Sequence, residues 1–536
     1  MDRRVSSPFT FIVFAGVLGV GCGEAPSTTE GPIEISDVST LAADNLTGGT
    51  PSSAAVSAAR PVASFSSIAV GLNSAAWDSM DANGTPALLD ATGVQTVRYP
   101  GGSTSDNYHW LTNLPDDPNQ GGTVPDGNFD NFMSMVTSTG SQAMITVNYG
   151  SGTEQEAADW VRYANRGGSH YRGPLPTYAD GCSQGHNFGI KYWEVGNELY
   201  GDGTYGATWE VNHKTVGPST YAQGVVSYSA AMKAADPSIH VGAVLTAPSN
   251  WPDGQTSADS PAPWNDTVLP IACKAIDFVV VHWYPQGPTG ESDAALLASP
   301  LNGESTSVSY TNGIPAMVAT LKSQLAQYCG RHAGAVQIMV TETNSVSYNP
   351  GKQTTSLVNA LFLADQLLTW FENGVTNVDW WALHNSPFDG NVDPALYGSN
   401  NFGDYGVLSA GGTTAAGAVE PPLNTPFPAY YGLQMLSHLG HQSQDGLLSA
   451  TSSNPLVAVH AVRQKNGKIN VLLVNKDPAV RYSVTVSLTG ASSHGNASVY
   501  RYGINSTAIT ASRAQVHGSA FTISVDPYSL TTVKLP

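Results

Sequence analysis

Short apolar runs alternate with amphipathic stretches through the middle of the chain, from about residue 64 to about residue 440. The apolar runs are rich in β-branched and aromatic residues, which is typical of buried strands. We therefore predict eight strands: Ser67–Asn73, Val94–Pro100, Ala143–Tyr149, Ile190–Asn197, Ile239–Val244, Phe278–Tyr284, Gln337–Glu342 and Val378–Leu383.

The stretches between these strands have helical spacing, and the clearest are Glu154–Asn165, Thr220–Ala235, Ile314–Cys329 and Thr355–Asn373, with a last helix near Pro428–Leu439. Strands that alternate with helices indicate an α/β fold with a parallel sheet. Eight such units predict a (β/α)8 barrel, a TIM barrel, over residues 64–440. The active site of such a barrel lies at the carboxyl ends of its strands.

Beyond about Gly440 the pattern changes to an alternation of apolar and polar residues, with turns at Asn466-Gly467 and Gly503. The runs that show it are Leu456–Arg463, Ile469–Asn475, Tyr482–Leu488, Ala497–Tyr502 and Phe521–Val525. This pattern predicts an antiparallel β-sandwich over residues 441–536. Whether that domain binds carbohydrate or only packs against the barrel stays open.

The first 22 residues have the features of an export signal: Arg3 and Arg4, then an apolar run from Phe9 to Val20. Leu18-Gly19-Val20-Gly21-Cys22 is similar to a bacterial lipoprotein cleavage site, although Leu lies four residues before the Cys instead of three. We expect an exported protein on the bacterial cell surface, an outer-membrane lipoprotein attached to the membrane through a lipidated Cys22. Plain secretion is the alternative. Residues 23–63 are rich in Ser, Thr, Ala and Pro and predict a flexible tether.

Composition excludes one class of partner. Only 12% of residues are charged and the formal net charge is -19, whereas nucleic-acid binding needs patches of Lys and Arg. No spacing of His, Cys, Asp or Glu predicts a metal site, and the sequence calls for no cofactor.

Four cysteines occur, and three remain if Cys22 is lipidated or removed: Cys182, Cys273 and Cys329. An odd number allows one disulfide and one free thiol. Cys273 and Cys329 each precede a predicted strand, and those strands are consecutive, so we predict that these two pair.

Two glutamates end predicted strands. Glu198 follows the fourth strand and Glu342 ends the seventh. Two carboxyl groups about 5–5.5 Å apart can cleave a glycosidic bond with retention. Glu198 is the candidate acid/base, for which we expect a raised pKa, and Glu342 is the candidate nucleophile, which must stay ionised.

Further side chains near the strand ends are candidates to orient the substrate or tune the carboxyls, and they are Arg98, Asn148, Asn197, His282 and Tyr284. We expect Arg98 and Tyr284 to keep Glu342 charged. Trp283 and Trp381 are the better candidates for stacking on a sugar ring. The alternatives are a structural ion pair for Arg98, a satisfied polar contact for His282 and core packing for each tryptophan.

Four segments resemble known enzymes: Val97–Gly102 with Asn107–Trp110, Val147–Thr153 with Glu156–Val161, Lys191–Glu198, and His213–Thr215 with Ala235–Ile239. They are similar to the retaining glycosidases built on eight-stranded barrels, and most to glycoside hydrolase family 51, the α-L-arabinofuranosidases. The resemblance implies a carbohydrate substrate and a double displacement, with Glu198 as acid/base and Glu342 as nucleophile.

The chain also departs from that family. The first predicted strand runs into Gly71–Trp77 without the family's sugar-binding Glu, and Trp380–Asn385 lacks its Gln. Thr341-Glu342-Thr343-Asn344 stands where the family has Asp-Glu-Trp-Asn. The runner-up is therefore a β-glycosidase or endo-glycanase for glucan, xylan or galactofuranoside. Two other classes are a non-catalytic glycan-binding surface lipoprotein and a metal-dependent barrel hydrolase.

Overall fold

The structure is a computed structural model that describes residues 48–80, 84–116, 122–169, 171–179, 184–207, 210, 217–303 and 312–536. The leader 1–22, Cys22 and the tether up to residue 47 lie outside the described residues, so those predictions stay predictions. Cys182 and His213–Thr215 also lie outside them.

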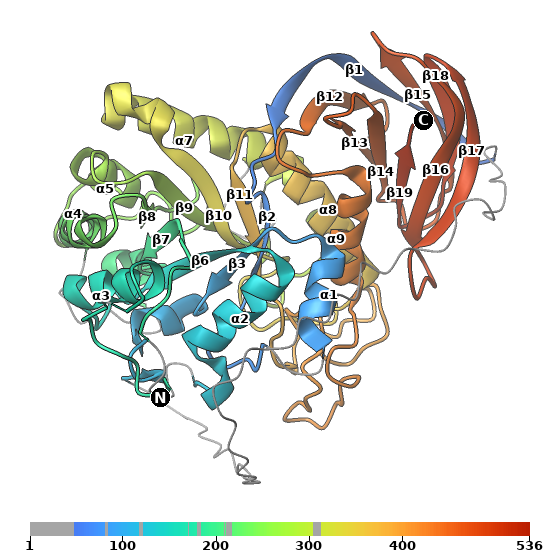
Figure 1. The fold of residues 1–536 in the computed structure, drawn as a ribbon. Coiled ribbons are helices and arrows are strands. Elements are labelled where there is room, and N and C mark those ends of the chain that lie inside the picture. The colour runs from blue at the N-terminus through green and yellow to red at the C-terminus, as the bar shows by residue number, and fades with distance from the viewer. Residues whose placement is uncertain are drawn as a thin grey trace.

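Eight parallel strands close into a barrel, as predicted (Figure 1). In chain order they are β2 (Val70–Asn73), β3 (Thr96–Tyr99), β6 (Gln142–Val147), β7 (Tyr192–Val195), β8 (His240–Val244), β9 (Phe278–Trp283), β10 (Gln337–Thr343) and β11 (Asn377–Trp380). The pairing of β11 with β2 completes the circle. Nearly every strand residue is buried, because side chains fill the inside and helices cover the outside.

The described helices are α1 (Thr85–Thr92), α2 (Phe129–Thr139), α3 (Glu154–Asn165), α4 (Pro218–Ala235), α5 (Trp264–Ala272), α6 (Asp293–Asn302), α7 (Ile314–Cys329), α8 (Leu357–Glu372) and α9 (Pro428–Leu439). Local chemistry explains their ends. Thr153 caps α3 by accepting the backbone N–H of Glu156, and Glu154 lies in the first turn, where the helix dipole favours negative charge. In the described part of the chain, no helix is long and apolar enough to cross a membrane.

A disulfide joins Cys273, just after α5, to Cys329, the last residue of α7, which confirms the predicted pairing. A short hairpin of β4 (Tyr108–His109) and β5 (Leu114–Pro115) lies beyond the carboxyl end of β3.

The C-terminal strands are β12 (Gly446–Ser452), β13 (Val457–Arg463), β14 (Ile469–Asn475), β15 (Tyr482–Thr489), β16 (Ser493–Gly503), β17 (Thr510–Gly518), β18 (Ala520–Val525) and β19 (Ser529–Lys534). They form a strand-rich C-terminal domain, as predicted, but its form as an antiparallel β-sandwich is not confirmed in detail. One closed circuit of hydrogen-bonded strands runs through all of them and through β1 (Thr50–Ser64), which pairs antiparallel with β12 and parallel with β15.

The tether prediction is therefore wrong for residues 50–63. Strand β1 is built mainly from small and polar residues, which gave no apolar period strong enough to predict a strand. Its inward positions Ala54, Val56 and Ala58 are buried in the core of the C-terminal sheet, and its backbone is hydrogen-bonded along both edges. Long-range pairing thus overrides local composition here.

Helices α8 and α9 lie between the barrel and the C-terminal strands (Figure 1). From Leu357 to Phe371, every residue of α8 is buried. A helix that is covered on all sides needs no polar face, which explains its almost continuous apolar sequence.

Position 71 in β2 has room only for glycine, because a side chain of β11 lies close to its backbone. A Cβ atom at this position would lie 1.6 Å from Oδ1 of Asp379. That carboxyl is fully buried and accepts a 2.8 Å hydrogen bond from the Asn377 side chain, so it has no room to retreat.

We expect Gly71→Ala to lower the free energy of unfolding by about 3 kcal/mol, the upper end of overpacking costs. Denaturant unfolding measures this. Gly334→Ala is the matched control, since no atom lies within 4 Å of its would-be Cβ. Equal stability of the two variants would show that the barrel relaxes around the methyl group.

Candidate active site

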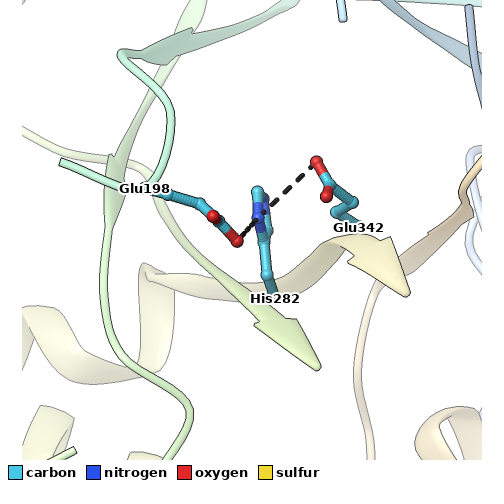
Figure 2. A group of neighbouring side chains, drawn as sticks. All are labelled: Glu198, His282 and Glu342. Carbon is cyan, nitrogen blue, oxygen red and sulfur yellow. Dashed lines mark hydrogen bonds and ion pairs between the residues drawn. The ribbon is translucent and has the colours of Figure 1, made fainter. Parts of the chain in front are cut away.

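Glu198 and Glu342 come together at the carboxyl ends of the fourth and seventh barrel strands, with His282 from the end of β9 between them (Figure 2). One carboxylate oxygen of each glutamate and one ring nitrogen of His282 all lie within 4.8 Å of one another. This close approach of two carboxylate oxygens is nearer to the carboxyl spacing of retaining enzymes, about 5–5.5 Å, than to that of inverting enzymes, about 6.5–9.5 Å.

The backbone turns sharply to present Glu198. Glu198 has φ 44 and Gly196 has φ 74, so the left-handed region is used twice within three residues. A Cβ on Gly196 would lie 2.4 Å from Cδ2 of Leu199, which only glycine avoids. The N–H of Asn197 donates to Oδ2 of buried Asp106 at 3.0 Å and fixes the turn. Strained backbone of this kind is common at functional sites.

Glu342 is held by the two predicted partners. The Tyr284 hydroxyl donates to Oε1 at 2.6 Å, and Nη1 of Arg98 lies 3.4 Å from Oε2. Nδ1 of His282 is 3.7 Å from the same Oε2. These donors align the carboxylate and each lowers its pKa, but burial and Glu198 outweigh them, so the expectation that Arg98 and Tyr284 keep Glu342 charged is met only in part.

Arg98 on β3 is fully buried and connects four side chains. Its Nε donates to Glu194 at 2.7 Å, Nη1 to Asn73 at 2.9 Å and Nη2 to Oδ1 of Asn197 at 2.8 Å, and Nη1 also contacts Glu342. Burial opposes its charge, but Glu194 and Glu342 outweigh burial and raise the pKa of Arg98 above its ordinary value. Arg98 therefore forms a structural ion pair with Glu194 and also contacts Glu342, the carboxyl whose charge it was predicted to stabilise.

The hydrogen bonds of His282 define where its protons lie. The single hydroxyl proton of Thr341 is donated to Glu194 at 3.2 Å, so Nε2 of His282 donates to Oγ1 of Thr341 at 3.1 Å. Nδ1 faces Oε1 of Glu198 at 2.8 Å. This second contact is a hydrogen bond only if either Nδ1 or the Glu198 carboxyl carries a proton.

The pKa values of Glu198 and Glu342 shift in directions that differ from those expected for an acid/base and a nucleophile. Burial raises the pKa of Glu198, but the hydrogen bond and charge of His282 outweigh it and bring the pKa below its ordinary value. Burial and the nearby Glu198 raise the pKa of Glu342 more than His282, Arg98 and Tyr284 lower it. The expected raised pKa of the acid/base is thus wrong for the free site, because Nδ1 of His282 lies closer to Glu198 than to Glu342.

Asn148 shapes a loop instead of reaching the carboxyls. Its Oδ1 accepts the backbone N–H groups of Ser151 and Gly152 at 2.9 Å each, and its Nδ2 donates to the carbonyl oxygen of Tyr108 at 3.2 Å. These bonds occupy its polar atoms. The predicted role in orienting substrate is therefore corrected to one in building the loop after β6.

Trp283 is wrongly predicted as a sugar platform. Its ring is 1% exposed and packs against Phe362 and Trp370 of α8, with ring centroids 6.0 and 5.7 Å away. Successive strand residues point to opposite sides, so His282 and Tyr284 face the site while Trp283 faces the helix.

Trp381 lies just after β11 and remains the candidate platform at the catalytic end of the barrel. Its ring is 8% exposed and lies 6.1 Å from the ring of Trp77, tilted by 56°. A Cβ on Gly102 would lie 3.0 Å from the Trp381 ring, so the lack of a side chain at Gly102 leaves room for the indole. Trp77, in the segment that lacks the family's acid, was not predicted as a site residue.

Other residues that build the site were also missed. Asp106 is fully buried and accepts backbone N–H groups from Tyr149 and Asn197. Glu194 accepts from Arg98 at 2.7 Å and from Thr146 at 2.8 Å inside the barrel. The signal for Glu194 was an acid at an inward position of a strand otherwise rich in aromatic and apolar residues.

Glu198, His282 and Glu342 have the ligand types and proximity of a small metal site. The positive guanidinium of Arg98 lies 3.4 Å from the Glu342 carboxylate, however, and opposes a cation there. The donor set fits a pair of reacting carboxyls better than a metal centre.

The fold and site together define a (β/α)8 barrel with two closely spaced carboxyls at the carboxyl ends of its strands. No family model matches the chain. Alpha-L-arabinofuranosidase C of Emericella nidulans is 29% identical over 209 residues, which are 36% of this chain and 38% of that protein. The match thus spans about two-fifths of the length of this relative.

Solved structures match over nearly the whole chain. An α-L-arabinofuranosidase from Thermotoga maritima, in an arabinose complex, has a TM-score of 0.65 at 19% identity and covers 90% of this chain and 99% of its own. A Paenibacillus polymyxa xyloglucanase of glycoside hydrolase family 44 has a TM-score of 0.62 at 16% identity, with 91% and 99% covered. The resemblance to arabinofuranosidases is confirmed, and the shared fold extends to a glucanase.

Proposed function

We propose that the protein is a retaining glycoside hydrolase whose first candidate substrates are α-L-arabinofuranosides in oligosaccharides or polysaccharides. The observation that carries this proposal is the approach of the Glu198 and Glu342 carboxylates to within 4.8 Å at the ends of β7 and β10. The similarity to arabinofuranosidases of Emericella nidulans and Thermotoga maritima supports the choice of sugar.

The mechanism follows from the contacts. Glu342, held by Tyr284 and Arg98, attacks the anomeric carbon while the bond to the leaving oxygen breaks and Glu198 protonates that oxygen. Water then attacks the glycosyl-enzyme as Glu198 takes its proton, which releases the sugar with net retention. Asn197, oriented by Arg98 and Asp106, lies beside the acid/base and can bond a sugar hydroxyl.

The runner-up is a β-glycosidase or endo-glycanase on the same barrel. The xyloglucanase with the same fold supports it, as does the absence of an acid between Gly71 and Trp77. In that case the same carboxyl pair acts on a different sugar.

A panel of nitrophenyl glycosides separates the two candidates. We expect nitrophenol release from the α-L-arabinofuranoside, and proton NMR of the first-formed sugar should show the substrate's own anomeric configuration. Chelator in the buffer is expected to leave the rate unchanged. Inertness toward the arabinofuranoside with release from a β-glycoside or a glucan would favour the runner-up, and an inverted product would exclude the covalent step.

A further inference from the structure

An exposed tryptophan lies at the catalytic end of the barrel. Trp251 belongs to the loop that leaves the carboxyl end of β8 and leads to α5, and it is 49% exposed. Every other tryptophan that the structure describes is buried or half-buried. A single exposed apolar side chain is ordinary on a protein surface, so its neighbours decide whether this ring has a function.

The aromatic neighbour of Trp251 is Tyr205, which belongs to the turn after the acid/base. The two ring centroids lie 4.4 Å apart, with the ring planes tilted by 41°. Tyr205 ends the helical turn Gly201–Tyr205, whose first N–H donates to the carbonyl oxygen of Glu198 at 2.8 Å. A Cβ on Gly201 would lie 2.9 Å from the Tyr205 hydroxyl, so the phenol reaches back to the start of this turn. The rings of Trp251 and Tyr205 thus form one aromatic surface beside the acid/base.

The loop that carries Trp251 is held by its own polar groups. Oδ2 of Asp253 accepts the backbone N–H of Ser249 at 2.7 Å, and Oδ1 accepts the hydroxyl of Thr246 at 3.0 Å. The N–H of Asp253 donates to the carbonyl oxygen of Asn250 at 2.6 Å. These bonds close the loop around Trp251 and fix the position of its backbone. A ligand that stacks on the indole therefore loses little affinity to ordering the loop.

The place of the aromatic surface in the barrel tells which part of a substrate would cover it. In the proposed mechanism Glu198 protonates the leaving oxygen, so the leaving group lies on the side of Glu198 and away from Glu342. Strands β7 and β8, which precede the two rings, are neighbours, whereas β10 with Glu342 lies two strands beyond β8. Trp381 follows β11, the strand on the other side of β10. The aromatic surface is therefore on the leaving-group side of the site.

We propose that the aromatic surface binds a sugar unit of the leaving group, so that the substrate is a chain of sugars and not a glycoside with a small aglycone. The inference rests on the proposed glycosidase function. One face of a sugar ring consists of C–H groups, which stack on the negative face of an indole or phenol ring. Stacking of this kind reads no particular hydroxyl, so the surface fits a furanose and a pyranose alike. Trp251 and Tyr205 contact the leaving group and take no part in the chemical step.

Trp251→Ala tests the proposal with two substrates that share the reacting sugar and differ in the leaving group. One is a trisaccharide, arabinotriose for the first candidate function and xylotriose or cellotriose for the runner-up. The other is the matching glycosyl fluoride, whose leaving group is a single atom and does not reach the aromatic surface. We expect kcat/KM for the trisaccharide to fall by about 10-fold, the scale of one aromatic stacking contact, mainly through a higher KM. For the fluoride, kcat/KM should change by less than about twofold.

Trp251→Phe is the conservative variant, and it should recover most of the loss because it keeps an aromatic face. Leu456→Ala is the surface control, since Leu456 is 42% exposed and lies between β12 and β13 of the C-terminal domain. It should leave the rates for both substrates unchanged. The proposal is overturned by an equal fall for trisaccharide and fluoride, which would make Trp251 a support for the Glu198 turn, and equally by an unchanged trisaccharide rate.

Calorimetric titration separates the sugar site from the proposed function. The trisaccharides are titrated into Glu342→Gln, which forms no glycosyl-enzyme, and into the double variant that also carries Trp251→Ala. We expect the double variant to bind about 10-fold more weakly. If the parent hydrolyses no glycoside but this difference in binding is present, the glycosidase function fails and the sugar site stands. If the parent hydrolyses its glycoside but the two variants bind alike, or neither binds any trisaccharide, the sugar site alone fails.

Discussion

Glu342→Gln is expected to lower kcat by about 10⁴-fold or more toward whichever glycoside the parent hydrolyses, the scale of losing a covalent nucleophile. An amide does not attack the anomeric carbon. It also offers one acceptor where the carboxylate offers two, so either Tyr284 at Oε1 or Arg98 at Oε2 would face an NH2 group. Steady-state kinetics with a nitrophenyl glycoside measures the loss.

Glu291→Gln serves as the control, because it replaces a buried glutamate outside the pair of carboxyls, and its rate should stay near that of the parent. Azide added to Glu342→Gly should restore part of the turnover and give a glycosyl azide of inverted configuration, because the small anion takes the place of the missing carboxylate. Hydrolysis by Glu342→Gln at the parent's rate would remove Glu342 as nucleophile. The barrel would then be a hydrolase that uses other groups.

The barrel was predictable because its strands are continuous apolar runs that need no partner to be recognised. Strand order then placed Glu198 and Glu342 on the same rim, since the carboxyl ends of parallel strands meet at one end of the barrel. Arg98 and Tyr284 followed from the same reasoning, and both reach Glu342.

What was missed depends on contacts between distant segments. Strand β1 is recognisable only once β12 and β15 flank it, about 380 to 430 residues away. Trp283 and His282 are neighbours in sequence with opposite directions, and only the position of α8 tells which side is core.

A network of four charged side chains, three of them buried and one partly exposed, joins the barrel to the C-terminal domain. Asp365 of α8 lies 2.9 Å from Nε2 of His460 and 2.5 Å from Nζ of Lys476, and Glu372 lies 2.8 Å from Nδ1 of His460. Burial opposes the charge of His460, but Glu372 and Asp365 raise its pKa to about 10. Burial also opposes the charge of Asp365, but Lys476 and His460 lower its pKa to about 2.

The network defines a pH window of stability. The folded pKa of His460 is above its ordinary value of 6.5, so its contribution is complete below about pH 6.5 and is lost as pH rises toward 10. The folded pKa of Asp365 is below its ordinary value of 3.8, so its contribution is complete above about pH 4 and is lost as pH falls toward 2. We therefore expect the contribution of the network to the free energy of unfolding to be largest between about pH 4 and pH 6.5.

Asp365→Asn is expected to lower the free energy of unfolding by about 3–5 kcal/mol at pH 6, since it leaves buried Lys476 and His460 without their shared anion. The alkaline decline of stability should also be smaller and end at lower pH, because His460 keeps only Glu372 and its folded pKa is raised less. Chemical unfolding across the pH range measures both effects. Asp526→Asn breaks the Arg481–Asp526 pair, whose side chains are 57% and 46% exposed, and should cost at most about 1 kcal/mol. If Asp365→Asn costs no more than this control, apolar packing around α8 and not the charge network holds the two domains together.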